Sequence, residues 1–249
     1  MQEPFTGTTP SWTDRFDALI FDLDDTLLDT TGQLIAPAIR RACASMIEAG
    51  LQTDLETCVT AHQQFFRQKP GEDVYQRLAL FFGVVPGGDP IQVGRLGAKA
   101  YTHYELDRPL SLFDGIKSLL DELKRAFALY LVTSGSPATQ RQKIDALAIA
   151  PLFRNIHLVD SSKGQRKGAA FREILSQGSY APQRVLCIGD RPDKEIRDAR
   201  QLGLGTVRIR YGEYAHLEPR DPEEHADHTI EHICLLAEVL TTSNPDPNP

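Results

Sequence analysis

The sequence predicts an α/β protein whose core is a parallel β-sheet covered by helices on both faces. Short apolar runs alternate with helical patterns along most of the chain, and continuously apolar strands are typical of parallel sheets. One stretch, from Thr30 to about Arg108, shows helical patterns alone. A connection between neighbouring strands needs far fewer residues, so this stretch is predicted to be an all-helical insert.

Five apolar runs are the predicted strands of the sheet. They are Ala18–Phe21, Ala128–Val132, Ile156–Val159, Arg184–Ile188 and Thr206–Ile209. The later runs are separated by amphipathic patterns, which predict helices at Ile116–Lys124, Pro137–Leu147, Ala169–Ser176 and Lys194–Leu202. Strands that alternate with helices in this way are typical of βαβ units.

The insert contains four segments with helical periodicity. In the first, Ile39, Cys43 and Met46 fall on one face, and Gly50 closes the pattern. The last segment has a weaker helical pattern because it contains two glycines. The four segments are residues 36–50, 54–68, 72–83 and 90–106.

These patterns predict a discontinuous domain organisation. The α/β core comprises residues 16–28 and 109–240, and the helical cap comprises residues 29–108. The N-terminal extension, residues 1–15, is predicted to be flexible. The tail, residues 241–249, is polar and proline-rich and is predicted to be disordered.

Composition and charge exclude several classes of partner. Lys and Arg number 27 and Asp and Glu number 34, which gives a formal charge of −7 and a pI near 5.5. An acidic chain is a poor candidate for non-specific binding to nucleic acid or to an anionic membrane. The sequence also lacks an apolar run that approaches the roughly 18 residues of a membrane span.

Cysteine spacing and the N-terminus predict a cytoplasmic protein. The cysteines form no CxxC pair, so neither a zinc knuckle nor a dithiol motif is expected. Cys187 lies in the apolar run Val185–Ile188 and is predicted to be a small buried hydrophobe. The first residues, MQEPFTGTTPSW, have neither a basic start nor an apolar stretch, so no signal peptide is expected.

Carboxylates, hydroxyls and a lysine follow the predicted strands. The run FDLDDTLLD, from Phe21 to Asp29, places four acids directly after the first strand. Ligands of open parallel sheets bind at the carboxyl ends of the strands, so residues after each strand should meet at one edge. Crowded acids there suit a hard dication, which predicts a site for Mg²⁺ and phosphate. The candidate residues are Asp22, Asp24, Asp25, Thr26, Thr133, Ser134, Gly135, Lys163, Lys167, Asp190 and Glu195.

The order and spacing of these residues resemble the haloacid dehalogenase superfamily of phosphohydrolases. Its first motif, DxDx(T/V) after an apolar strand, is matched by Asp22-Leu23-Asp24-Asp25-Thr26. Its second, a strand that ends in Thr or Ser, is matched by Thr133. Its third, a lysine ahead of a helix, is matched best by Lys167. Its fourth, a strand followed by GDxxxxD, is matched by Gly189-Asp190 with Glu195 in the last place.

The resemblance covers about residues 16–240 and implies a Rossmann-like parallel sheet core with an inserted all-helical cap domain of the C1 type. In the family such caps generally accompany small soluble substrates. Two positions depart from the family pattern. Glu195 stands where Asp is usual, which keeps the charge and lengthens the side chain. The third motif lacks the common Lys-Pro pair, so Lys163 competes with Lys167 for the motif lysine.

The resemblance implies an Mg²⁺-dependent phosphatase that hydrolyses a small phosphate monoester through an aspartyl-phosphate. Asp22 is the expected nucleophile, and Asp24 the acid for the leaving group and later the base for water. Thr133 and Lys167 are expected to stabilise the charge of the transferring group. The expected metal ligands are Asp22, Asp190, Glu195 and the Asp24 backbone carbonyl. The expected phosphate contacts come from the loops of Asp25, Thr26, Ser134 and Gly135.

Other functions remain open at this point. A dehalogenase is disfavoured because such members lack the second acid of the first motif, here Asp24. A phosphomutase of the same fold would use the same acids and differ in the cap. A regulatory or binding module could have kept the fold without catalysing a reaction. The sequence does not identify the phosphorylated metabolite, and it leaves open whether the chain is a monomer or a homodimer.

Several other polar residues receive a less specific interpretation. His225, His228 and His232 are interpreted as surface histidines near the last helix rather than as a metal cluster. The side chains of Asp25 and Asp29 are predicted to be solvated or to cap a helix. In the cap, Arg67 and Lys69 are candidates for holding a distal anion of the substrate.

Overall fold

The structure is a computed structural model and describes residues 15–69, 73–102 and 109–241. These residues divide into two compact units. One lies within Met1–Asp29 and Leu110–Pro249 and contains the sheet, so we call it the sheet unit. The other lies within Thr30–Pro109 and contains helices, so we call it the helical unit.

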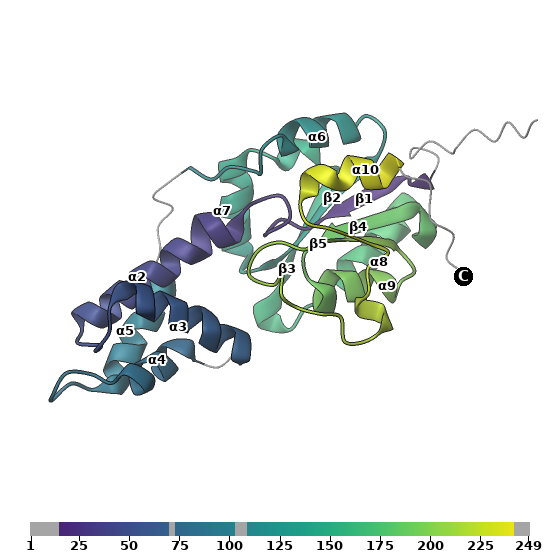
Figure 1. Ribbon diagram of the computed structural model, residues 1–249. Coiled ribbons are helices and arrows are strands. Elements are labelled where there is room, and N and C mark those ends of the chain that lie inside the picture. The colour runs from purple at the N-terminus through teal and green to yellow at the C-terminus, as the bar shows by residue number, and fades with distance from the viewer. Residues whose placement is uncertain (1–14, 70–72, 103–108, 242–249) are drawn as a thin grey trace, which may run out of the picture. The chain divides into compact units, whose positions relative to one another are not determined.

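The sheet unit is built on a parallel sheet whose strands follow the order β3-β2-β1-β4-β5-β6 (Figure 1). The first strand of the chain therefore lies inside the sheet, with β2 on one side and β4 on the other. All of its residues are buried, which explains why the run ALIF is apolar throughout. The strands are β1 (Ala18–Phe21), β2 (Ala128–Gly135), β3 (Asn155–Asp160), β4 (Val185–Gly189), β5 (Gly205–Ile209) and β6 (His228–Ile230).

Helices cover both faces of this sheet, as the sequence predicts. Helices α8 (Lys167–Gly178) and α9 (Arg197–Arg200) pack against one face, where Phe171 and Ile174 share a core with Ile20 and Cys187. Figure 1 shows α6 (Ile116–Leu123) and α10 (Leu236–Thr241) over the opposite face. The burial of Cys187 confirms its prediction as a core residue.

The connections of the sheet unit contain one further helix and several short helical turns. Helix α7 (Pro137–Leu147) follows β2 and has proline at its first position, where the missing N–H costs nothing. The remaining elements are the 3₁₀ turns η2 (Ala150–Leu152), η3 (Ser161–Lys163), η4 (Pro182–Arg184), η6 (Pro222–Glu224) and η7 (Ile233–Leu235), and the π-helix η5 (Pro192–Ile196).

Two segments of the sheet unit differ from the prediction. Residues His228–Ile230, between His225 and His232, form the edge strand β6, which the sequence analysis does not predict. A strand of three residues in which only Ile230 is buried has too little apolar pattern to be recognised. The predicted helix Lys194–Leu202 starts earlier, as the π-helix η5, and only then continues as α9.

The helical unit consists of the π-helix η1 (Thr31–Ile35) and α2 (Ala36–Glu48), α3 (Leu55–Gln68), α4 (Val74–Phe82) and α5 (Pro90–Thr102). Asp54 and Asp73 cap α3 and α4, since each side chain accepts a hydrogen bond from a backbone N–H of the first turn. Within the described ranges of the whole chain, no helix is long and apolar enough to cross a bilayer.

The two glycines that weaken the sequence pattern of α5 have a packing role. A Cβ at Gly97 would lie 2.5 Å from the Met46 Sδ, and one at Gly94 would lie 2.8 Å from the Gln76 Oε1. Both distances are shorter than atoms tolerate. The glycines therefore let α5 pack closely against α2 and α4.

Candidate active site

The carboxyl ends of β1, β2 and β4 lie side by side at one edge of the sheet. The chain adds β2 and β3 on one side of β1, and β4, β5 and β6 on the other. Ligands of open parallel sheets bind where the strand order reverses in this way. Because Phe21 is level with Leu131 and with Ile188, the residues that follow these strands are brought together.

Three buried carboxylates face one another at this edge. Asp22 follows β1, Asp190 follows β4 and Glu195 lies in η5, and each offers an oxygen within 4.8 Å of the others. Their exposed fractions are 7%, 4% and 1%. The Asp22 N–H donates to the Ile188 carbonyl at 2.9 Å, and the Asp190 carbonyl accepts from the Arg208 Nε at 3.3 Å. The backbone thus fixes the two aspartates of the cluster.

A buried lysine, Lys167, lies among these carboxylates. Its Nζ is 2.8 Å from the Asp22 Oδ1 and 3.0 Å from the Glu195 Oε2. Lys163 is exposed and pairs with Asp160 at 3.4 Å. Of the two lysines that the sequence left open, Lys167 is therefore the one that contacts the cluster. Its position is set at the start of α8, where the Gly168 N–H donates to a buried carboxylate of α9.

Burial and mutual repulsion shift the pKa values of this cluster. Burial raises the pKa of Asp22 to about 7, with repulsion from Glu195 and Asp24 added and Lys167 opposing. Burial, Glu195 and Asp22 raise the pKa of Asp190 well above its usual range. Burial works against a low pKa at Glu195, but Lys167 and the Arg191 N–H outweigh it and lower that pKa. Asp22 and Glu195 likewise raise the pKa of Lys167 against the effect of burial.

The chemistry of this donor set fits a hard dication. Three carboxylates meet one lysine, so their charge is not balanced within the cluster. A Cβ at Gly189 would lie 2.5 Å from the Glu195 Cγ, so glycine there is what lets the longer glutamate arm reach the cluster. Among the described residues, this group contains carboxylates and neither a cysteine nor a histidine. A small set of oxygen ligands is typical of Mg²⁺ sites.

Asp24 lies on the side of the edge that faces β2 and α7. Its Oδ1 is 2.6 Å from the Lys143 Nζ, and its Oδ2 accepts from the Gln140 Nε2 at 2.7 Å. The same amide group donates to the Thr133 Oγ1 at 2.5 Å and to the Ser134 carbonyl at 3.1 Å. Two residues that the sequence analysis missed, Gln140 and Lys143, thus connect the second acid of the first motif to the end of β2.

The prediction that Asp25 is solvated is wrong. Asp25 is 4% exposed, adopts a left-handed backbone with φ 53°, and accepts from the Glu213 N–H at 3.4 Å. Its own N–H donates to the Leu28 carbonyl at 2.8 Å, so this N–H is engaged within the loop. A Cβ at Gly212 would collide with the Asp25 carboxylate, which explains a glycine there. Asp25 is buried because it anchors the loop after β5.

The other predicted residues of the first two motifs lie beside these groups. The Thr26 hydroxyl is buried and has no hydrogen-bond partner among the described residues. Ser134 and Gly135 are half-buried at the end of β2. Arg67 belongs to the helical unit, where it lies in the last turn of α3, and Lys69 follows that helix. Asp29 is half-buried, and it raises the pKa of Tyr211 in addition to the burial of that ring.

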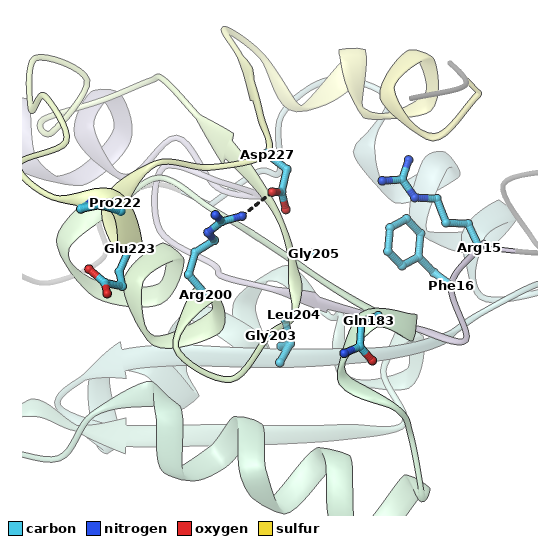
Figure 2. A pocket seen from close by; sticks show the side chains of 10 residues that line it. All are labelled: Arg15, Phe16, Gln183, Arg200, Gly203, Leu204, Gly205, Pro222, Glu223 and Asp227. Atoms are coloured by element: carbon cyan, nitrogen blue, oxygen red, sulfur yellow. Dashed lines mark hydrogen bonds and ion pairs between the residues drawn. The ribbon is translucent and has the colours of Figure 1, made fainter. Parts of the chain in front are cut away.

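A hollow of about 510 Å³ opens at the opposite edge, beside the amino ends of β1, β4 and β5 (Figure 2). Arg200 and Asp227 form an ion pair at its wall, and Arg15 and Glu223 also line it. None of the predicted site residues lines this hollow. The chemically distinctive groups of the sheet unit therefore gather at the carboxyl edge and not in this hollow.

Known proteins match this chain over most of its length. The family model of haloacid dehalogenase-like hydrolases matches residues 16–203. A glyceraldehyde 3-phosphate phosphatase of Methanopyrus kandleri is 31% identical over 228 residues, which cover 90% of this chain and 96% of that protein. An N-acetylmuramic acid 6-phosphate phosphatase of Pseudomonas aeruginosa is 28% identical and covers 91% and 95% of the two chains.

Solved structures show the same fold. The HAD-hydrolase YfnB of Bacillus subtilis superimposes with a TM-score of 0.62 at 22% identity, over 92% of this chain and 100% of that one. With the strand order, the motif spacing and the family match, this agreement confirms the predicted resemblance and fold class. The chain belongs to the haloacid dehalogenase-like hydrolases.

Proposed function

We propose that the protein is a Mg²⁺-dependent phosphatase that hydrolyses a small phosphate monoester through an aspartyl-phosphate. The observation that carries this proposal is the buried group of Asp22, Asp190 and Glu195 with Lys167. The named phosphatases among the relatives support it. The bound dication would be held by these carboxylates and by the Asp24 carbonyl, and it would reduce repulsion between the Asp22 carboxylate and a phosphate dianion.

Asp22 is the nucleophile in this proposal. A carboxylate oxygen of Asp22 forms a bond to phosphorus, and the bond from phosphorus to the ester oxygen breaks. Lys167, 2.8 Å from Asp22, is placed to stabilise the charge on the phosphoryl oxygens. Thr133 and Thr26 supply hydroxyl groups at the same edge, and the Ser134–Gly135 loop supplies backbone N–H groups.

Asp24 moves the protons in both steps. In the first step it donates a proton to the leaving alkoxide, and in the second it removes a proton from the water that attacks the aspartyl-phosphate. The products are the free alcohol, inorganic phosphate and regenerated Asp22. Asp22 cannot perform this role, because it is esterified between the steps. Asp25 is proposed to shape the loop rather than to contact phosphate, since its N–H and its carboxylate are both engaged.

Glyceraldehyde 3-phosphate is the first substrate to test. Three relatives with this substrate in their names are 27–31% identical to this chain, and the match covers more than nine-tenths of each of them. The helical unit is proposed to act as a cap that recognises the organic part of the substrate. Arg67 and Lys69 are candidates for binding an anionic group of the substrate that is distant from the phosphate.

A panel of phosphate monoesters tests the proposal. The panel contains glyceraldehyde 3-phosphate, N-acetylmuramic acid 6-phosphate, phosphoserine and p-nitrophenyl phosphate, and phosphate release is measured with Mg²⁺, with Ca²⁺ and with excess EDTA. We expect release with Mg²⁺, weaker release with Ca²⁺, which prefers more ligands and looser geometry, and none with EDTA. Full activity in excess EDTA, or halide release from 2-haloacids without phosphate release from any monoester, would contradict it.

A further inference from the structure

The inner face of α7 is polar at its first half. The buried residues of this helix are Gln140, Lys143, Ile144 and Leu147, which follow the spacing of a single helix face. The last two are apolar, as expected of a face that packs on a sheet. Burying a glutamine and a lysine costs free energy unless each finds a partner. Their presence on this face therefore requires an explanation beyond packing.

The partners of this polar pair converge on one carboxylate. Lys143 contacts the Oδ1 of Asp24 at 2.6 Å, and Gln140 donates to its Oδ2 at 2.7 Å. Because two side chains from one helix turn contact both oxygens, they fix the rotation of the carboxyl group. Without them a half-buried aspartate in a loop would sample several orientations.

Gln140 extends the contact to the phosphate side of the site. Its side-chain amide has two hydrogens and lies within 3.1 Å of three acceptors, on Asp24, Thr133 and Ser134. One amide group thus sets the spacing between the Asp24 carboxylate and the Thr133 hydroxyl. These are the two groups that would contact the leaving oxygen and the phosphoryl group.

We propose that Gln140 and Lys143 are positioning residues for the proton transfers of Asp24, with Gln140 also positioning Thr133. The inference rests on the proposed function, in which Asp24 is the acid and base. An acid must lie within hydrogen-bond distance of the leaving oxygen, and a misplacement of about 1 Å can cost on the order of 10²-fold in rate. A rigid helix face is better able to supply this accuracy than a loop.

The leaving group distinguishes positioning from mere structural support. In Lys143→Met, we expect kcat/KM for alkyl and sugar phosphates to fall by about 10- to 100-fold, because these leaving groups need a proton. For p-nitrophenyl phosphate the fall should be under about threefold, since this leaving group needs little protonation. A loosened fold would lower both rates alike. Lys143→Arg keeps N–H donors for Asp24 and should restore most of the loss.

Variants on the same helix supply the comparison. Gln142 lies between the two residues and is exposed, so Gln142→Ala should match the wild type with every substrate. Gln140→Ala should lose rate with both kinds of leaving group and bind inorganic phosphate more weakly, because Thr133 also loses its contact. Circular dichroism and the unfolding midpoint identify any variant that does not fold.

The double variant with Asp24→Asn completes the test. If Lys143 acts through Asp24, adding Lys143→Met to Asp24→Asn should lower the rate no further. Independent losses in the double variant, equal losses for good and poor leaving groups in Lys143→Met, or a fully active Lys143→Met beside a damaged Asp24→Asn would each overturn the proposal. Undiminished turnover of alkyl phosphates by Asp24→Asn would instead overturn the assignment of Asp24 itself, and the proposal with it.

Discussion

The two units of the protein bury ionisable side chains in opposite ways. In the described part of the helical unit, the buried polar side chains are Thr30 and His62, and burial lowers the pKa of His62 to about 4. That imidazole is neutral at neutral pH and packs beside the rings of Phe66 and Tyr75. The sheet unit instead brings buried carboxylates together around Lys167.

This difference in how ionisable groups are buried distinguishes an ordinary hydrophobic core from a candidate active site. A core avoids charge, and a titratable group that must be buried there becomes neutral. The carboxyl edge of the sheet keeps its acids close together although burial and repulsion raise the pKa values of Asp22 and Asp190. Such an arrangement lowers stability unless a ligand compensates it, so it indicates function.

The largest effect is expected from Asp22→Asn. Turnover should fall by about 10⁴-fold or more, because an amide does not attack phosphorus. The same change should raise the unfolding midpoint of the metal-free protein at pH 8 by a few degrees. The ionised Asp22 carboxylate is unfavourable in the folded state above its raised pKa of about 7, and the amide removes this cost.

Thermal unfolding in EDTA and phosphate release with Mg²⁺ check both halves of this prediction. Cys187→Ala, a change in the core of the same sheet, is the control, and it should lower the midpoint. A less stable Asp22→Asn protein would show that the ionised Asp22 carboxylate does not destabilise the folded protein. The two units would then not differ in the cost of their buried ionisable groups.

A smaller effect separates Asp24 from Asp25. Asp24→Asn should lose about 10²- to 10⁴-fold in turnover of alkyl phosphates, whereas Asp25→Asn should stay within about threefold of the wild type. The asparagine at 25 can still accept from the Glu213 N–H. Rapid-quench measurement of the aspartyl-phosphate should show a burst followed by a stall for Asp24→Asn with p-nitrophenyl phosphate. An Asp25→Asn protein as damaged as Asp24→Asn would place the acid elsewhere.

The third prediction concerns the direction in which the stability of the helical unit changes with pH. His62 has a folded pKa of about 4, below the unfolded value of 6.5, so the unfolded state binds more protons between these values. The contribution of neutral His62 to the free energy of unfolding is thus fully present above pH 6.5. It is lost as the pH falls toward 4, and the loss amounts to up to about 3 kcal/mol.

Urea unfolding between pH 4 and pH 7 measures this slope, and His62→Phe should flatten it. Phosphatase activity of His62→Phe at pH 7 should remain, because His62 is buried in the core of the helical unit. An NMR titration that places the pKa of His62 above 6 would contradict the expected sign.

The smallest effect is expected at an exposed ion pair of the helical unit. Arg40 and Glu56 are paired at 2.6 Å across α2 and α3, but both side chains are exposed. Because water and salt screen such pairs, Glu56→Gln should leave the unfolding midpoint and the activity unchanged within error. A shift as large as that from His62→Phe would show that burial is not what distinguishes these groups.

Much of the sheet unit could be predicted because the strands β1, β2 and β4 are buried along most of their length. The run ALIF is apolar throughout, the other predicted strands are mostly apolar, and Asp22 and Asp190 stand directly after β1 and β4. β6 could not be predicted in this way, since one buried residue, Ile230, makes no pattern. The burial of Asp25 could not be predicted either, because it depends on Gly212 and Glu213, which come far later in the chain.

The contribution of α7 was missed for a different reason. Its helical limits, Pro137–Leu147, agree with the prediction, yet the sequence analysis did not single out Gln140 and Lys143. Their spacing from Ile144 and Leu147 carries a signal, since it places two polar residues on the apolar face. Only the position of Asp24 in the folded sheet shows what these residues contact.

The place of β1 in the sheet has a consequence for the newly made chain. β1 is synthesised first, but its neighbours begin at Ala128 and Val185. At about 5–20 residues per second, a ribosome needs on the order of 10 to 30 s to pass from β1 to β4. During that time the apolar run ALIF has no complete pair of neighbours, whereas the helical unit can already fold. We therefore expect the proposed nucleophile, Asp22, to be inert during synthesis, because it meets Lys167 and Asp190 only when β4 and the residue after it have been made.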